Sequence, residues 1–159
     1  MVDSKKIILV LVFACGVLAG ALIMGIVSAP GGHMGKQAVF STHAPAPIGL
    51  YSQAVQSGNL VFLSGQIGID PATGNISDPV EGQTSRSMEN LRAVLNESGL
   101  GFGDVVQTRI YLVNMSDWNA VNGIYDSYFK DNPPARSAVQ VAGLPKGAKV
   151  EIEMVAEKW

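Results

Sequence analysis

The C-terminal segment shows the strictest residue pattern in the sequence. From 149 to 155 apolar and charged residues alternate: the apolar set is Val150, Ile152 and Met154, and the charged set is Lys149, Glu151 and Glu153. Successive side chains of a β-strand point to opposite faces, so this period of two predicts a strand with one apolar and one polar face. Such a strand belongs to a sheet whose apolar face is covered by other elements, which restricts the chain to a layered architecture.

The remaining segments alternate between strand-like and helix-like patterns. Strands are predicted over 38–42, 54–57, 60–64, 105–113 and 137–141, with Gly58-Asn59 as the turn of a hairpin. Helices are predicted over 83–98 and 117–129 from their apolar stripes, which contain Met88, Leu91, Val94 and Leu95 in the first and Trp118, Val121, Ile124, Tyr125 and Tyr128 in the second. The order β-β-β-α-β-α-β-β predicts an α+β fold, one sheet with both helices on one face.

Arg136 and Glu151 are the candidate functional pair on these strands. Pro133-Pro134 keeps the backbone before Arg136 extended, because a residue that precedes proline is excluded from the helical region. A guanidinium can bind a small carboxylate through two parallel hydrogen bonds, and a glutamate on a rigid strand can orient water or accept a proton. We expect both side chains on the uncovered face of the sheet, together with Glu153. The alternative is that Arg136 and Glu151 simply pair with each other at a surface.

Composition excludes several classes of function. The formal net charge is −2 and no basic block occurs, so the electrostatic footprint of a nucleic-acid-binding protein is missing. Cys15 is the only cysteine, so no intrachain disulfide can form. The histidines are His33 and His43, and with no cysteine beyond residue 15 a Cys/His metal site is excluded from the C-terminal domain.

The N-terminal part has a composition of its own. The segment 7–29 contains no charged residue and, as a helix, could span a bilayer core of about 30 Å. Lys5 and Lys6 precede it, which predicts a cytoplasmic N-terminus (1–6), a single-pass transmembrane helix (7–29), a linker (30–37) and a domain outside the cytoplasm (38–159). The alternative is a cleaved signal peptide, but Pro30 after the small residues Val27-Ser28-Ala29 disfavours cleavage there.

A series of short motifs follows in order along the chain. The segments are Ala46-Pro47-Ile48-Gly49 with Tyr51-Ser52-Gln53-Ala54, Gly58-Asn59-Leu60-Val61-Phe62 with Ser64-Gly65-Gln66-Ile67, Asn90-Leu91 with Ala93-Val94-Leu95, Val121-Asn122 with Tyr125, Pro134-Ala135-Arg136-Ser137, Leu144-Pro145-Lys146, and Glu151-Ile152-Glu153. Together these motifs resemble the RidA (YjgF-type) family of reactive-intermediate deaminases. The resemblance covers about residues 38–157. Leu50 stands where the family usually has proline, and Ala138 stands where many members have cysteine.

This resemblance implies a chorismate-mutase-like subunit, a homotrimer with sites between subunits, and hydrolysis of 2-imino or enamine acids to 2-oxo acids and ammonia without metal or organic cofactor. It implies that Arg136 holds the substrate carboxylate and that Glu151 positions the attacking water. It also implies substrate-binding roles for Tyr51, Ser64, Asn122 and the backbone around Ala138.

Simpler roles remain open for most of these residues. Glu153 on the same strand face could serve the water instead of Glu151. Ser64 could only cap a strand end, and Asn122 could only bond a neighbouring loop. Trp118 and Tyr128 are expected in the core. The whole chain could also be a catalytically silent, membrane-tethered module that binds small carboxylates or a partner.

Overall fold

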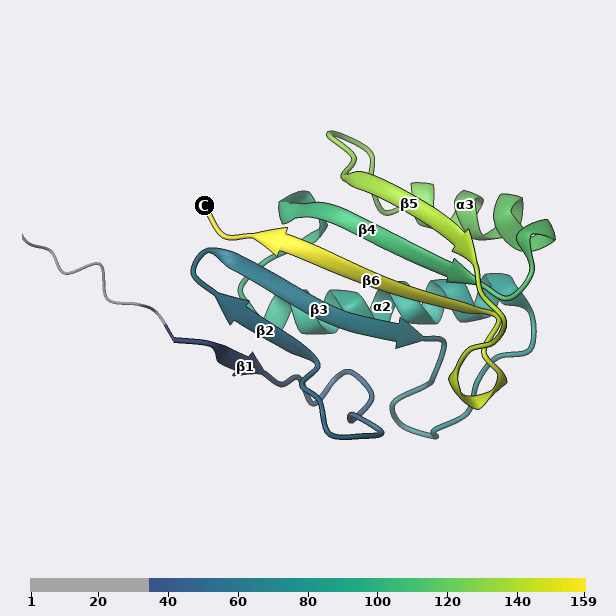
Figure 1. Ribbon diagram of the computed structural model, residues 1–159, viewed down its shortest axis with the longest axis horizontal. Helices are drawn as coiled ribbons and strands as arrows, with labels where there is room; N and C mark the ends of the chain where they lie inside the picture. Colours follow the sequence, from purple (N-terminus) through teal and green to yellow (C-terminus); the bar gives the residue numbers. More distant parts are fainter. Residues whose placement is uncertain (1–34) are drawn as a thin grey trace, which may run out of the picture. The chain divides into compact units, whose positions relative to one another are not determined.

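The C-terminal strand β6 (Val150–Glu157) lies within a mixed six-stranded sheet, between β3 (Leu60–Ile67) and β4 (Val105–Leu112). The computed structural model describes residues 35–159. The strand order is β1-β2-β3-β6-β4-β5, with β1 at Gln37–Val39, β2 at Ala54–Ser57 and β5 at Ala135–Gln140 (Figure 1). All neighbouring strands are antiparallel except β4 and β5, which are parallel. The predicted α+β order is confirmed for this part of the chain.

Two helices cover one face of the sheet, α2 (Val80–Glu97) and α3 (Trp118–Asp126) (Figure 1). Short 3₁₀ turns occur at η1 (Phe102–Asp104), η2 (Met115–Asp117) and η3 (Pro145–Gly147). We call the covered side the helix face and the other side the open face. No helix within residues 35–159 has the length and apolar character needed to cross a bilayer. The predicted membrane segment 7–29 lies outside the described residues.

The core forms where the apolar residues of the strands meet the helix stripes. The alternation predicted for β6 is confirmed, because its apolar set is buried and its glutamates are only partly buried. The stripe predicted for α2 is fully buried, and in α3 the buried residues are Val121 and Tyr125. The fully buried side chains of largest volume include Met88, Leu91, Leu95, Leu112, Ile152 and Met154.

The helix boundaries differ from those predicted. Helix α2 begins at Val80, directly after Pro79, whose extended backbone ends the preceding loop. Helix α3 ends at Asp126, and the next three residues continue as tighter turns in which each N–H bonds the carbonyl three residues earlier. Strand β3 runs three residues beyond the predicted end, through a bulge between Leu63 and Gln66.

The register of β5 corrects the predicted position of Arg136. Arg136 is paired with Thr108, which is fully buried on the helix face. Arg136 therefore lies on the helix face, whereas Glu151 and Glu153 lie on the open face. The sequence pattern of β5 could not show this, because β5 is an exposed edge strand without apolar alternation, and a shift of one residue exchanges its faces.

Candidate functional site

A hollow of about 360 Å³ lies at the end of β3 and the start of β6. Its lining residues are Ile48, Tyr51, Ser64, Gly65, Ile67, Pro145, Glu151 and Glu153. Of the predicted site residues, Tyr51, Ser64 and Glu151 are thus brought together here. We call Tyr51, Ser64, Gly65 and Glu151 the carboxylate half-site.

Gly65 allows Glu151 to lie against the backbone of β3. A Cβ atom built on Gly65 would lie 1.9 Å from Glu151 Oε1 and 2.8 Å from its Cδ. The glycine is part of the bulge between Leu63 and Gln66, where the regular pairing of β3 with β6 is interrupted. The missing side chain thus creates the space that the carboxylate occupies. The sequence signal was the small-residue run Ser64-Gly65, although it did not identify Glu151 as the neighbour.

The loop that carries Tyr51 is anchored by a buried glutamine. The Gln53 Nε2 donates hydrogen bonds to the carbonyl oxygens of Ser41 and Pro45 at 3.1 and 2.9 Å, and its Oε1 accepts one from the Ser41 N–H at 2.6 Å. The Tyr51 hydroxyl accepts a hydrogen bond from the Ile48 N–H at 3.3 Å, and its side chain is half-exposed at the rim of the hollow. The loop can therefore hold an aromatic ring at the mouth of the site.

Ser64 has a structural contact in addition to its place in the hollow. Its hydroxyl donates a hydrogen bond to the Ser52 carbonyl at 2.7 Å. This bond connects β3 to the residue beside Tyr51. Ser64 can still accept a hydrogen bond from a ligand, because a hydroxyl oxygen has two lone pairs.

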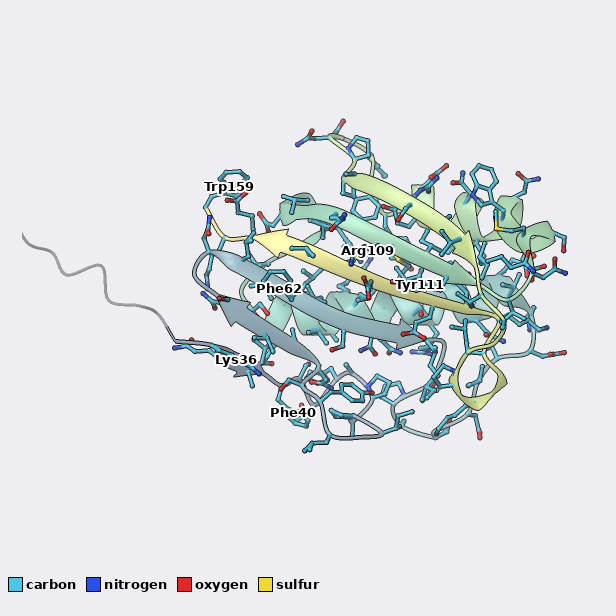
Figure 2. The ribbon with its side chains drawn as sticks, in the orientation of Figure 1. Lys36, Phe40, Phe62, Arg109, Tyr111 and Trp159 are labelled. Atoms are coloured by element: carbon cyan, nitrogen blue, oxygen red, sulfur yellow. The ribbon has the colours of Figure 1, made fainter. Side chains whose placement is uncertain are left out.

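The two glutamates on β6 have different partners. Glu153 forms an ion pair at 2.5 Å with Arg109 on the neighbouring strand β4, where Figure 2 labels the arginine. Within residues 35–159 Glu151 has no hydrogen-bond or ion-pair partner. Burial raises the pKa of the Glu151 carboxyl, and the nearby negative charge of Glu153 raises it further. Glu151 is therefore the better placed of the two to accept a proton.

Glu153→Gln is expected to lower the pKa of Glu151. The substitution removes the like charge that raises this pKa, which favours the ionised form of Glu151. A carboxyl ¹³C NMR titration measures this pKa directly. Glu157→Gln, at the far end of the same strand, is the matched control and should leave it unchanged. An equal pKa of Glu151 in wild type and Glu153→Gln would contradict the assigned cause.

Arg136 lies on the helix face in a narrow hollow that, in this chain alone, has no room for a water molecule. The lining residues are Ile110, Leu112, Trp118, Val121, Asn122, Arg136 and Ala138. The predicted residues Arg136, Asn122 and Ala138 are thus brought together, but apart from Glu151. Trp118 joins them and is 37% exposed, which corrects its predicted place in the core. We call Trp118, Asn122, Arg136 and Ala138 the guanidinium half-site.

Aromatic rings and one carboxylate hold the guanidinium. The Arg136 Cζ lies 4.7 Å from the ring centre of Tyr125 and 6.0 Å from that of Trp118. The Tyr125 ring is fixed because its hydroxyl bonds Thr108 Oγ1 at 3.2 Å. Arg136 Nη1 is also 3.7 Å from Asp126 Oδ1. The predicted alternative, a surface pair of Arg136 with Glu151, is therefore not formed in the chain.

Asn122 provides an unused acceptor beside Arg136. Its Oδ1 is buried and has no hydrogen-bond partner, the one such side-chain atom among residues 35–159. A buried acceptor without a donor costs free energy, about 1–3 kcal/mol. A ligand N–H or O–H could satisfy it once the side chains around the hollow move apart to admit the ligand.

The predicted site residues thus divide into two complementary sets on opposite faces of the sheet. One set offers a guanidinium and an unsatisfied acceptor, and the other offers an uncompensated carboxylate beside a hollow. Asp126, Tyr125 and Gly65 were not predicted as site residues. For Asp126 the available signal was its spacing of four residues from Asn122, which places both side chains on one helix face.

Comparison with known proteins identifies the family. The family model described as Endoribonuclease L-PSP matches residues 41–158. The human protein named 2-iminobutanoate/2-iminopropanoate deaminase is 43% identical over 122 residues, which is 76% of this chain and 89% of the human one. The crystal structure of E. coli TdcF with bound serine has a TM-score of 0.75 and 37% identity, and covers 77% of this chain and 98% of its own. The E. coli YjgF structure has a TM-score of 0.75 and 38% identity, and covers 77% of this chain and 99% of its own. The chain therefore belongs to the RidA/YjgF/L-PSP family.

Proposed function

We propose that the chain is a hydrolytic deaminase that converts 2-imino or enamine acids into 2-oxo acids and ammonia. The observation that carries this proposal is the complementarity of the two half-sites: a carboxylate-binding group with a free acceptor, and a proton-accepting group with a hollow. The names of the deaminase relatives at 43–47% identity support the same reaction class.

In the proposed reaction Arg136 binds the substrate carboxylate through two N–H donors. Glu151 accepts a proton from water while the water oxygen bonds to the imine carbon and the electron pair of the C=N π bond moves to nitrogen. Glu151 then gives this proton to the nitrogen. It next takes the proton of the new hydroxyl group and passes it to the nitrogen, so that the C–N bond breaks, the carbonyl forms and ammonia leaves. An imine carbon is already electrophilic, so the reaction needs orientation of water and a proton acceptor more than a strong nucleophile.

The remaining site residues would shape the pocket. Tyr51 would close it from its loop, and Ser64 and Asn122 would line it. The Asn122 Oδ1 would accept a hydrogen bond from the substrate, and the backbone around Ala138 would meet the substrate nitrogen. No step of this mechanism uses a metal or an organic cofactor.

A complete site would need two copies of the chain. Arg136 and Glu151 lie on opposite faces of one sheet, so the guanidinium half-site of one copy would meet the carboxylate half-site of the next. We propose a homotrimer with sites between subunits. Light scattering coupled to size-exclusion chromatography tests this, and a protein that stays monomeric at assay concentration would contradict it.

The test of the reaction uses an imine generated in situ by an amino-acid oxidase. Semicarbazide traps the imine that remains, so an active deaminase lowers the yield of trapped product and raises the rate of 2-oxo acid release. A protein that binds 2-oxobutanoate without either effect would instead be the silent binding module.

We also propose that residues 7–29 anchor residues 38–159 to a membrane, with the N-terminus (1–6) cytoplasmic and the domain outside the cytoplasm. The support is the sequence pattern. Protease treatment of intact cells should then remove the domain, and mass spectrometry of the membrane fraction should find the full-length chain. A mature protein that begins near residue 30 would instead indicate a cleaved signal peptide.

A further inference from the structure

Asp126, at the last position of α3, contacts two residues of the guanidinium half-site with its two carboxylate oxygens. Asp126 Oδ2 accepts a hydrogen bond from Asn122 Nδ2 at 2.8 Å, and Asp126 Oδ1 is 3.7 Å from Arg136 Nη1. Its side chain is 61% exposed, so the carboxylate stands at the surface of the hollow. One side chain thus bridges an amide and a guanidinium that are both assigned to substrate binding.

The bond to Asn122 fixes the direction of the amide. If the amide were turned over, its Oδ1 would face the Asp126 carboxylate, and two acceptors repel. With Nδ2 directed at Asp126, Oδ1 is the atom that faces inward, where it is buried and has no donor. Asp126 therefore determines that the half-site presents an acceptor beside Arg136.

The contact with Arg136 is weaker. A separation of 3.7 Å is longer than a hydrogen bond, so the pair is a loose ion pair. The guanidinium is held in place mainly by the Tyr125 ring at 4.7 Å. Its N–H donors thus stay available for a substrate carboxylate, which would lie next to the charge of Asp126.

We propose that Asp126 is a positioning residue that also sets charge selectivity: it orients the Asn122 amide and disfavours substrates with a second negative charge. This inference rests on the proposed function. A carboxylate at the mouth of a site repels an anionic side chain and attracts a cationic one. For partly exposed charges several ångströms apart, this repulsion or attraction changes kcat/KM about five- to tenfold for each unit of charge.

The test compares imines generated from glutamate, 2-aminobutyrate and arginine, whose side chains are anionic, neutral and cationic. Wild type should prefer the neutral imine to the anionic one by about five- to tenfold, and the cationic imine to the neutral one by about the same factor. Asp126→Asn keeps an oxygen that can accept the bond from Asn122 but removes the charge, so it should flatten this ranking and lower KM for the anionic imine. Asp126→Ala also loses the acceptor, and its kcat should fall where that of Asp126→Asn does not.

Glu97→Gln, in the last turn of α2, removes the same charge outside both half-sites and should leave the ranking unchanged. If Asp126 had a purely structural role, its variants would differ from wild type in stability but not in the ratio of kcat/KM between the substrates. The inference is overturned if wild type and Asp126→Asn show the same ratio of kcat/KM for the anionic and neutral imines.

Calorimetric binding of 2-oxobutanoate and 2-oxoglutarate separates this inference from the proposed function. If the wild-type protein lacks turnover, the deaminase proposal fails. A selective gain in 2-oxoglutarate affinity in Asp126→Asn would then still support the role of Asp126, and an unchanged affinity ratio would overturn it.

Discussion

Arg136→Ala should lower kcat/KM for a 2-imino acid by a factor of about 30 to several thousand. Truncation of one partner of a desolvated charge pair costs about 2–5 kcal/mol, and here the unpaired group would be the substrate carboxylate. The fold should remain intact, because Arg136 lies on an edge strand and its ion pair with Asp126 is loose. The measurement is the rate of 2-oxo acid release from an imine generated in situ, with circular dichroism as the check on folding.

Two further variants test whether the loss of activity comes from the guanidinium of Arg136. Arg86→Ala removes a partly exposed arginine that pairs with Asp70 outside both half-sites, and it should keep wild-type activity. Arg136→Lys retains the charge but loses the planar pair of donors, so it should recover only part of the activity. Full activity in Arg136→Ala would show that the guanidinium does not bind the substrate.

The proposed position of the site between subunits allows a sharper form of the same experiment. Arg136→Ala and Glu151→Gln are each expected to be nearly inactive, since loss of a proton acceptor costs about 10²- to 10⁴-fold. If the two chains are co-expressed in equal amounts and assemble at random, about one quarter of the interfaces should combine an intact Arg136 with an intact Glu151. About one quarter of wild-type activity should therefore return. If both residues served one site within a single chain, no activity would return.

The sequence predicted the elements of this fold well but not the faces of its edge strand. The glutamates of β6 were placed on the correct side because their strand alternates strictly between apolar and charged residues. Strand β5 has no such alternation, and its side chains are mostly exposed. The side on which Arg136 lies is therefore decided by pairing with Thr108 and by the aromatic ring of Tyr125, which are long-range contacts.

Long-range contacts also decide the roles of Gly65 and Asp126, which affect the site through a neighbouring side chain. In the sequence Gly65 shows only that a small residue stands there, and its close approach to Glu151 depends on the register between β3 and β6. The bond between Asn122 and Asp126 is local and follows from their spacing on α3, whereas the contact of Asp126 with Arg136 requires the tertiary structure. The spacing in the sequence could thus indicate the contact of Asp126 with Asn122 but not its contact with Arg136.

Gly65→Ala should reduce activity nearly as much as Glu151→Gln while the protein stays folded. The added Cβ would lie 1.9 Å from Glu151 Oε1, so the carboxylate must move away from β3. The backbone of Gly65 lies outside the left-handed region, so alanine can adopt it without strain. The atoms in conflict belong to a flexible side chain, and we expect a loss of no more than about 1 kcal/mol in the free energy of unfolding.

Two other glycines show why this result would be specific. At Gly68 an added Cβ would meet the Gln83 Cα at 2.5 Å, which is backbone of α2, so Gly68→Ala should destabilise the fold itself. At Gly103 nothing lies within 4 Å, and Gly103→Ala should change neither stability nor activity. Urea unfolding and imine turnover, measured on all three variants, separate the effects. If Gly65→Ala kept wild-type turnover, the position of the Glu151 carboxylate against β3 would be irrelevant to the reaction, and the assignment of Glu151 as the proton acceptor would lose its geometric basis.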